Sequence, residues 1–446
     1  MGFPIMRLVR AAALIIVIVA AGLVGGGAAA QTPQERALAA ARMLNEGRFA
    51  DLARDFSPQM AQALPAARLE QTWRAIVAQT GPLRGTGTPR EAKQSGFTVV
   101  TVPLNFDHAT LDLVLSYQQG KIAGLFIRPA QAPPRAWNPP DYDKASAYKG
   151  VEVMVGARPA LPGTLSLPRV GHKVAAVVLV HGSGPNDRDE TIGPNRPFAD
   201  LAAGLASHGI AVLRYDKRNK VVPQAFAPTR AFTVRDEVID DARAAVALLR
   251  ARPEIDPRRI IVLGHSLGAT LAPRIAEGDA DVAAIVLLAA AARPLAGIIV
   301  EQTEYLASLD GPPDAQMQAR LAEVRAAAAR ADAVKPGDTG GPILNLPRAY
   351  WADLNAHDPA ADAAALKIPV LVLQGGRDYQ VTTQDFDRFR AALAGHANAT
   401  LTLLPRLNHL FMAGEGKSVP AEYERPGHVD RAVIDAITAF VDGLPP

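Results

Sequence analysis

Residues 264–268, Gly-His-Ser-Leu-Gly, form a G-x-S-x-G pattern, which holds a serine at a sharp turn between a strand and a helix. The preceding residues 260–263 are β-branched and apolar, and residues 269–276 have helical character apart from one proline. The two glycines avoid clashes with the neighbouring strand and helix, and the helix N-terminus stabilises negative charge beside the serine. The pattern therefore predicts Ser266 as the nucleophile of an acyl-transfer reaction.

A serine hydroxyl is a weak nucleophile near neutral pH, so it needs an adjacent base that is itself oriented by a carboxylate. Behind a turn of this kind the chain order is serine, then acid, then histidine. Asp378 follows an apolar stretch and a double glycine at 371–376, where a catalytic acid is expected. The alternative is a turn aspartate that caps the helix beginning near Thr382. We predict Asp378 as the acid.

Three histidines follow this acid in the sequence. His396 lies in a polar turn before the last predicted strand, and His428 begins the terminal helix, so both are expected at the surface. His409 lies in the loop after the last predicted strand. All three histidines satisfy the order of residue types, so the expected surface positions of the other two lead us to predict His409 as the general base.

An acyl-transfer site also needs backbone N–H groups that stabilise the developing oxyanion. The residue after the nucleophile, Leu267, supplies one. The small residues 181–184 directly follow the apolar strand that ends at Val180, so the N–H of Ser183 is the second expected donor. The alternative for such a glycine-rich segment is a plain turn.

These residues need a sheet to bring them together, and the chain after residue 149 alternates strands and helices. Two segments, 150–155 and 163–167, predict a leading antiparallel hairpin. The near-continuous apolar strands that follow are typical of a mostly parallel sheet covered on both faces; they are expected at 174–180, 210–215, 260–263, 282–288, 370–373 and 400–404. Helices are expected between and after them, at 198–207, 234–251, 383–393 and 429–441. The alanine-rich helical stretch 292–362 is either a lid insertion or a structural excursion without contact to substrate.

The residues before this region predict a small α+β domain at 31–128. Its first part, 33–79, has helical periodicity, and three alternating segments at 97–104, 109–115 and 121–127 indicate an antiparallel meander. A proline-rich linker at 129–149 follows.

The first thirty residues resemble an export signal. Arg7 and Arg10 precede an apolar run, three glycines and three alanines, so cleavage is expected after Ala30. The alternative is an uncleaved anchor. Without residues 1–30, 45 basic residues balance 44 acidic ones, which argues against a nucleic-acid partner. The chain has no cysteine and no clear metal-ligand spacing, so we expect neither disulfides nor a metal.

The chain resembles the α/β-hydrolase superfamily over residues 150–446. The blocks 181–190 and 214–218 are similar to a bacterial secreted esterase subgroup that carries an N-terminal domain of unknown function. The resemblance implies the same triad of Ser266, Asp378 and His409. Six charged residues of the two blocks are expected to form ion pairs between loops, with a place at the site entrance as the alternative; they are Asp187, Arg188, Asp189, Asp216, Lys217 and Arg218. His265 is expected to be structural, and the tryptophans at 73, 137 and 351 are expected to serve packing, with an acyl site as their alternative.

The leading hypothesis is a serine esterase that cleaves small to medium acyl esters through an acyl-enzyme. We expect such an enzyme to need no cofactor and to act on a small-molecule ester. We also expect it to be periplasmic or secreted, with no membrane attachment once the signal is cleaved. A serine peptidase, a thioesterase or acyltransferase of the same fold, and a non-catalytic binding module stay open as alternatives.

Overall fold

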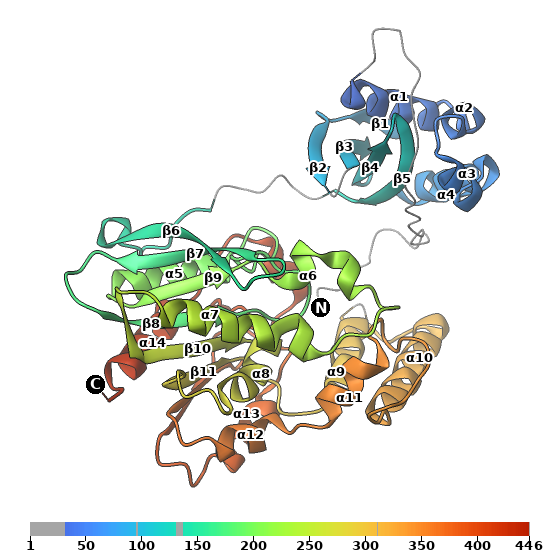
Figure 1. The fold of residues 1–446 in the computed structure, drawn as a ribbon. Helices are drawn as coiled ribbons and strands as arrows, with labels where there is room; N and C mark the ends of the chain where they lie inside the picture. Colours follow the sequence, from blue (N-terminus) through green and yellow to red (C-terminus); the bar gives the residue numbers. More distant parts are fainter. Residues whose placement is uncertain (1–31, 95–96, 131–136, 310, 446) are drawn as a thin grey trace. The chain divides into compact units, whose positions relative to one another are not determined.

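The structure, a computed structural model, describes residues 32–94, 97–130, 137–309 and 311–445. The chain divides into an N-terminal and a C-terminal compact unit (Figure 1). The predicted signal segment 1–30 lies outside the described residues, as does part of the predicted linker, 131–136. The domain boundaries drawn from the sequence stay predictions. Among the described helices, none combines the length and the apolar character that crossing a membrane requires.

The N-terminal unit places helices against an antiparallel sheet, which confirms the predicted α+β class. Its helices are α1 (Pro33–Asn45), α2 (Phe49–Ala53), α3 (Pro58–Ala63) and α4 (Ala66–Thr80). Its strands are β1 (Leu83–Thr86), β2 (Arg90–Gln94), β3 (Phe97–Phe106), β4 (Thr110–Gln118) and β5 (Lys121–Pro129). Thr32 and Glu35 form a capping box that begins α1, and Trp73 packs in the core between α4 and the sheet.

The C-terminal unit is built on one eight-stranded sheet, with the order β13-β12-β11-β10-β8-β9-β7-β6. The strands are β6 (Tyr148–Val155), β7 (Leu161–Pro168), β8 (Val174–Val180), β9 (Ala211–Tyr215), β10 (Ile255–His265), β11 (Ala284–Leu288), β12 (Val370–Gly375) and β13 (Ala399–Leu404). The six strands from β8 onward are parallel, and the β6–β7 hairpin adds to β9 in antiparallel fashion. The mostly parallel sheet with a leading hairpin is therefore confirmed.

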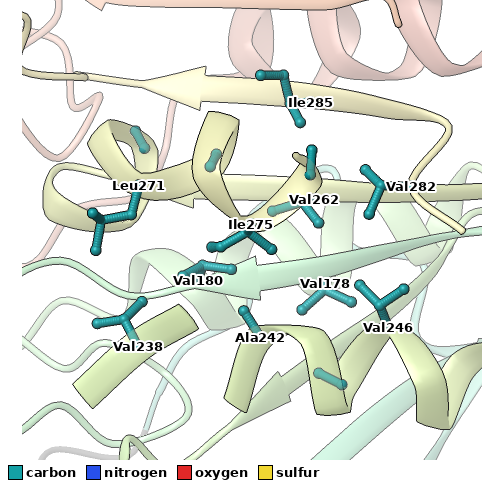
Figure 2. Close-up of a cluster of buried hydrophobic side chains, with 14 of the residues drawn as sticks. Val178, Val180, Val238, Ala242, Val246, Val262, Leu271, Ile275, Val282 and Ile285 are labelled. Carbon is teal, nitrogen blue, oxygen red and sulfur yellow. The ribbon is translucent and has the colours of Figure 1, made fainter. Parts of the chain in front are cut away.

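Helices cover both faces of this sheet (Figure 1). They are α5 (Pro197–Ser207), α6 (Arg218–Val221), α7 (Asp240–Arg250), α8 (Leu267–Ala276), α13 (Thr383–Ala392) and α14 (Arg431–Asp442), with short helical turns at Ala145–Ala147, Pro223–Phe226, Arg235–Ile239 and Pro420–Glu424. On one face α7 and α8 pack on β8 and β10, where Ala242, Leu271 and Ile275 meet Val178 and Val262 (Figure 2). On the other face α5 and α14 bury a second apolar cluster. Burial on both faces explains why the central strands are apolar at nearly every position.

A helical insertion connects β11 to β12. It consists of α9 (Leu295–Ser308), α10 (Ala315–Asp332), α11 (Arg348–Asn355) and α12 (Pro359–Ala365). The insertion has its own small apolar cluster around Trp351, which is fully buried and donates its indole N–H to the carbonyl of Ile343 at 2.9 Å. The alanine-rich stretch is therefore a folded layer with its own packing.

The sheet register brings two loops together at the carboxyl ends of the strands. In the parallel pair β8–β10, Gly264 is aligned with Val180, so both strands end at the same edge. In open α/β sheets the ligand site lies at this edge, beside a reversal of strand order. Here β9 and β10 flank β8 on opposite sides, which makes the loops after β8 and β10 the place to look.

Candidate active site

Ser266 lies at the turn between β10 and α8, as its motif predicts. Its backbone has φ 52° and ψ −117°, a conformation that costs a residue with a side chain about 1–3 kcal/mol. The glycines explain how the turn closes: a Cβ on Gly268 would overlap the Val180 carbonyl, and one on Gly264 would overlap the backbone of Gly268. The turn therefore exposes Ser266 where the N-terminus of α8 begins.

Both predicted oxyanion donors lie beside this serine. Ser183, Ser266 and Leu267 line one cavity of about 410 Å³. The N–H of Leu267 belongs to the first turn of α8, where backbone N–H groups have no acceptor within the helix. An ideal Cβ on Gly182 would lie 3.2 Å from the Cβ of Ser266, a tight contact that a larger residue could make only if its neighbours shifted slightly.

The structure joins Asp378 and His409, which are 31 residues apart in the sequence. His409 Nδ1 lies 2.7 Å from Asp378 Oδ2, and both side chains are buried. The other carboxylate oxygen, Oδ1, accepts the backbone N–H groups of Gln380 at 2.7 Å and Val381 at 3.1 Å. Gln374 Nε2 adds a contact of 3.3 Å to Oδ2. These bonds fix the carboxylate and orient the imidazole with its Nε2 edge free for another partner.

His409 also lies next to the nucleophile turn. The ring of His265, the residue before Ser266, lies 4.8 Å from the His409 ring, centroid to centroid. His265 Nε2 lies 2.9 Å from the His409 backbone carbonyl. A direct hydrogen bond from the Ser266 hydroxyl to His409 is absent from the described part of the chain, and such bonds often form only once substrate is bound.

The remaining candidates of the sequence analysis have structural partners. His396 Nε2 lies 2.8 Å from the carbonyl of Leu366, and His428 Nδ1 lies 3.1 Å from Asp200 Oδ1. Trp137 donates its indole N–H to the same Asp200 carboxylate at 2.9 Å. Neither these two histidines nor any of the three tryptophans lines the cavity at Ser266.

The charged blocks pair across the loops at this edge. Arg188 donates its backbone N–H to Asp216 at 2.9 Å and pairs with Glu152 at 2.8 Å. Arg214 pairs with Asp189, and Arg218 pairs with Asp241. The pairs of Arg188 and Asp189 connect the loop after β8 to β6 and to the end of β9, and the Arg218–Asp241 pair connects α6 to α7.

Sequence reasoning assigned no role to Glu190 and only a loop ion pair to Lys217. Glu190 is 1% exposed and lies 2.8 Å from His265 Nδ1, and Lys217 is 2% exposed and pairs with Glu237 at 2.8 Å. Burial alone would raise the pKa of Glu190, but the neighbouring His265 outweighs it and lowers that pKa below its usual range. Burial likewise opposes the charge of His265, yet Glu190 outweighs it and raises the pKa of His265. The only signal in the sequence was the position of Glu190 in the loop after an apolar strand.

The insertion forms much of the cavity wall. Apolar side chains come from α9 and α11, namely Leu295, Ile298, Ile299 and Leu354. Polar groups of the insertion also line it, among them Gln302 and Asn355. The insertion therefore lines the space next to Ser266.

No group of three or more histidine, aspartate or glutamate side chains in the described ranges is arranged to hold a metal ion.

Comparison with known proteins extends this picture over both units. Residues 177–424 match the model of the alpha/beta hydrolase family, and residues 37–125 match that of a protein family of unknown function, DUF3887. Esterase EstD of Thermotoga maritima is 39% identical over 387 residues, which cover 86% of this chain and 89% of EstD.

Similar solved structures include the esterase domain of a Rhodothermus marinus protein, with 18% identity and a TM-score of 0.39 over 66% of this chain and 97% of that one. The Pyrococcus furiosus esterase Pf2001 has 16% identity and a TM-score of 0.41 over 69% and 94%. The family match covers more than half of the chain, including the turn at Ser266, the Asp378–His409 pair and the loop at Ser183. The chain belongs to the alpha/beta hydrolase family.

Proposed function

We propose that this protein is a serine esterase that cleaves carboxylic esters through an acyl-enzyme on Ser266, with His409 as general base and Asp378 as the carboxylate that orients it. The observation that carries the proposal is the joint geometry of the strained Ser266 turn at the wall of a cavity and the 2.7 Å Asp378–His409 bond. The 39% identity to an esterase over most of both chains supports the ester as the bond that is cleaved.

In the first half-reaction the Ser266 Oγ attacks the ester carbonyl carbon while His409 Nε2 takes the hydroxyl proton. Asp378 Oδ2 accepts the Nδ1–H of His409 and stabilises the imidazolium that forms. The carbonyl oxygen becomes an oxyanion, and the N–H groups of Ser183 and Leu267 are the donors that line its position. Collapse breaks the bond to the alcohol oxygen, which leaves with the proton from His409.

In the second half-reaction a water molecule replaces the alcohol. His409 takes a proton from the water as it attacks the acyl-enzyme, and the same N–H groups hold the second oxyanion. Collapse returns the proton to Ser266 Oγ and releases the carboxylic acid. Loss of one oxyanion donor typically slows such reactions by about 10²–10³-fold.

The cavity favours substrates of modest size. Its 410 Å³ lies toward the small end of the range of roughly 300–1,000 Å³ that is typical of ligand pockets. The apolar side chains of α9 and α11 suit an acyl chain, so the proposal specifies small to medium acyl groups. The insertion that carries them is proposed as the lid over this site.

We also propose that the protein is exported, because of the charge and apolar pattern of residues 1–30. N-terminal sequencing of protein expressed in a bacterium would find Gln31 as the first residue of the periplasmic fraction. A full-length N-terminus in the membrane fraction would instead establish an uncleaved anchor.

The test of the catalytic proposal is paired. Fluorophosphonate labelling and hydrolysis of a p-nitrophenyl ester series are measured on the wild type, on Ser266→Ala and on the control Ser207→Ala. Ser207 suits the control because its hydroxyl accepts the Lys144 N–H at 2.7 Å and it is not one of the residues that line the cavity. Loss of both signals in Ser266→Ala alone supports the esterase. Labelling without ester turnover would favour a peptidase or thioesterase, and no labelling of folded wild type would leave a binding module.

A further inference from the structure

Gly182, the residue before the proposed oxyanion donor Ser183, is held on both sides by buried charged side chains. Its N–H donates to Glu190 Oε1 at 2.6 Å, and its carbonyl accepts Lys217 Nζ at 2.8 Å. Asn186 Nδ2 adds a longer bond of 3.2 Å to the same carbonyl. A glycine has no side chain to restrict its backbone, so these bonds supply the restriction.

The bond from Lys217 also fixes the direction of the Ser183 N–H. The carbonyl of Gly182 and the N–H of Ser183 belong to one planar trans peptide group, so they point in opposite directions. Because Lys217 holds the carbonyl on one side, the N–H is aimed to the other side, and Ser183 is one of the residues that line the cavity with Ser266. A rotated peptide group would turn the carbonyl toward the oxyanion and repel it.

Glu190 connects this loop to the loop of the general base. Its Oε1 accepts the Gly182 N–H, and its Oε2 lies 2.8 Å from His265 Nδ1. The other ring nitrogen of His265 lies 2.9 Å from the carbonyl of His409. A carbonyl can only accept, so His265 Nε2 carries a proton, and the lowered pKa of Glu190 together with the raised pKa of His265 favours a carboxylate that accepts from a protonated Nδ1. One carboxylate and one imidazolium thus hold the loops of Ser183, Ser266 and His409 relative to one another.

The charges of this network are balanced and out of contact with solvent. Glu190 pairs with His265, and Lys217 pairs with Glu237, which also accepts the Tyr350 hydroxyl at 2.8 Å. Breaking one buried pair leaves an uncompensated buried charge and is strongly destabilising. Such groups are expensive to bury, and stability alone does not explain why they converge on one glycine at the site.

We propose that Glu190 and Lys217 are positioning residues of the catalytic reaction: they fix the two sides of Gly182 so that the Ser183 N–H meets the oxyanion, and Glu190 also holds the His409 loop through His265. The inference rests on the proposed function, because it assigns these residues to the oxyanion step of that reaction. The oxyanion exists only in the intermediates and transition states, so disturbing the network lowers kcat and leaves KM nearly unchanged.

The test compares three variants of the full chain. Glu190→Gln keeps the shape but places an amide N–H against the protonated His265, and Lys217→Met keeps the apolar stem but removes the donor to Gly182. The control is Asp200→Asn, an equally buried carboxylate that also bridges a histidine, His428, and a backbone N–H, that of Val429. Unfolding midpoints, kcat, KM and the second-order rate of fluorophosphonate labelling are measured for each.

We expect both network variants to lose about 10–10³-fold in kcat and in labelling rate, within the range for a lost or misaligned donor, with KM changed by less than about threefold. Asp200→Asn is expected to lose stability but to keep kcat in its folded fraction. Unchanged kcat in Glu190→Gln and Lys217→Met, or an equal loss in Asp200→Asn, would overturn the positioning role. If Glu190→Gln does not fold, the Lys217→Met result decides alone. Failure of the proposed function is recognised separately, because Ser266→Ala would then keep the wild-type activity or the wild type would not label.

Discussion

The Asp378–His409 pair makes a demanding prediction for the substitution Asp378→Asn. The aspartate has two distinct oxygens: Oδ1 accepts the N–H groups of Gln380 and Val381, and Oδ2 accepts His409 Nδ1. An asparagine satisfies the two backbone donors only if its carbonyl takes the Oδ1 position. Its amide nitrogen then faces His409, where it donates instead of accepting.

This reversal selects the wrong form of the base. To accept the new N–H, His409 must carry a lone pair on Nδ1 and its proton on Nε2, the nitrogen that should receive the Ser266 proton. Gln374 cannot restore the original pattern, because its Nε2 is also a donor and already bonds the carbonyls of Gly375 and Val381. The expected loss in kcat is about 10⁴-fold, as for the same change in other serine triads. That corresponds to about 5 kcal/mol in activation free energy.

The assay is ester hydrolysis, with kcat calculated from the concentration of folded protein. The rate of fluorophosphonate labelling of Ser266 should fall in parallel with kcat. Asp241→Asn is the control, because Asp241 is a buried carboxylate that pairs with Arg218 rather than with His409. A kcat for Asp378→Asn within about tenfold of wild type would refute the reasoning, because tautomer control would then contribute no more than about 1.4 kcal/mol.

Three further outcomes are expected. In wild type, the pKa of His265 is raised on folding, so its contribution to the free energy of unfolding is complete below the unfolded pKa of 6.5 and is lost as pH rises through the folded pKa. The pKa of Glu190 is lowered on folding, so its contribution is complete above the unfolded pKa of 4.5 and is lost as pH falls through the folded pKa. Urea unfolding should therefore show the largest wild-type advantage over Glu190→Gln between these two values and a smaller one at alkaline pH; a constant difference across pH would contradict the ion pair. Leu295→Trp should shrink the cavity and lower kcat/KM for long p-nitrophenyl esters at least about tenfold relative to the acetate, judged from the chain-length series; an unchanged profile would remove α9 from the substrate site. Trp351→Ala should lower the free energy of unfolding by about 3–5 kcal/mol, because it empties a fully buried site in the insertion. Denaturant titration measures this loss, and a loss below about 1 kcal/mol would contradict the prediction and indicate that the site collapses around the smaller side chain.

The parts of the site that could be predicted are those with local signals. Ser266 is recognisable because the turn requires glycines on both sides, and those glycines stand in the sequence next to it. Asp378 and His409 follow apolar strands, so strand periodicity and chain order bring them into consideration. Strands β1 and β2, which both pair with β3, were not predicted, because short strands such as Arg90–Gln94 have little alternation of apolar and polar residues.

Glu190 and Lys217 show why the rest could not be predicted. Their partners lie 75 residues away at His265 and 35 residues away at Gly182. In the sequence each looks like one more charge in a charged segment, and most such charges are solvated or form loop pairs. Only the tertiary register of β8, β9 and β10 reveals that two of them are buried against the two sides of one residue, Gly182.

The connection between β11 and β12 has an evolutionary consequence. The groups proposed to break the ester bond follow β8, β10, β12 and β13, whereas the apolar wall of the cavity comes largely from α9 and α11. The proposed determinants of acyl size and the proposed catalytic groups are thus encoded in separate stretches of the gene. Changes confined to the segment between β11 and β12 are therefore expected to alter which acyl groups the protein accepts, while the loops proposed for catalysis keep their sequence.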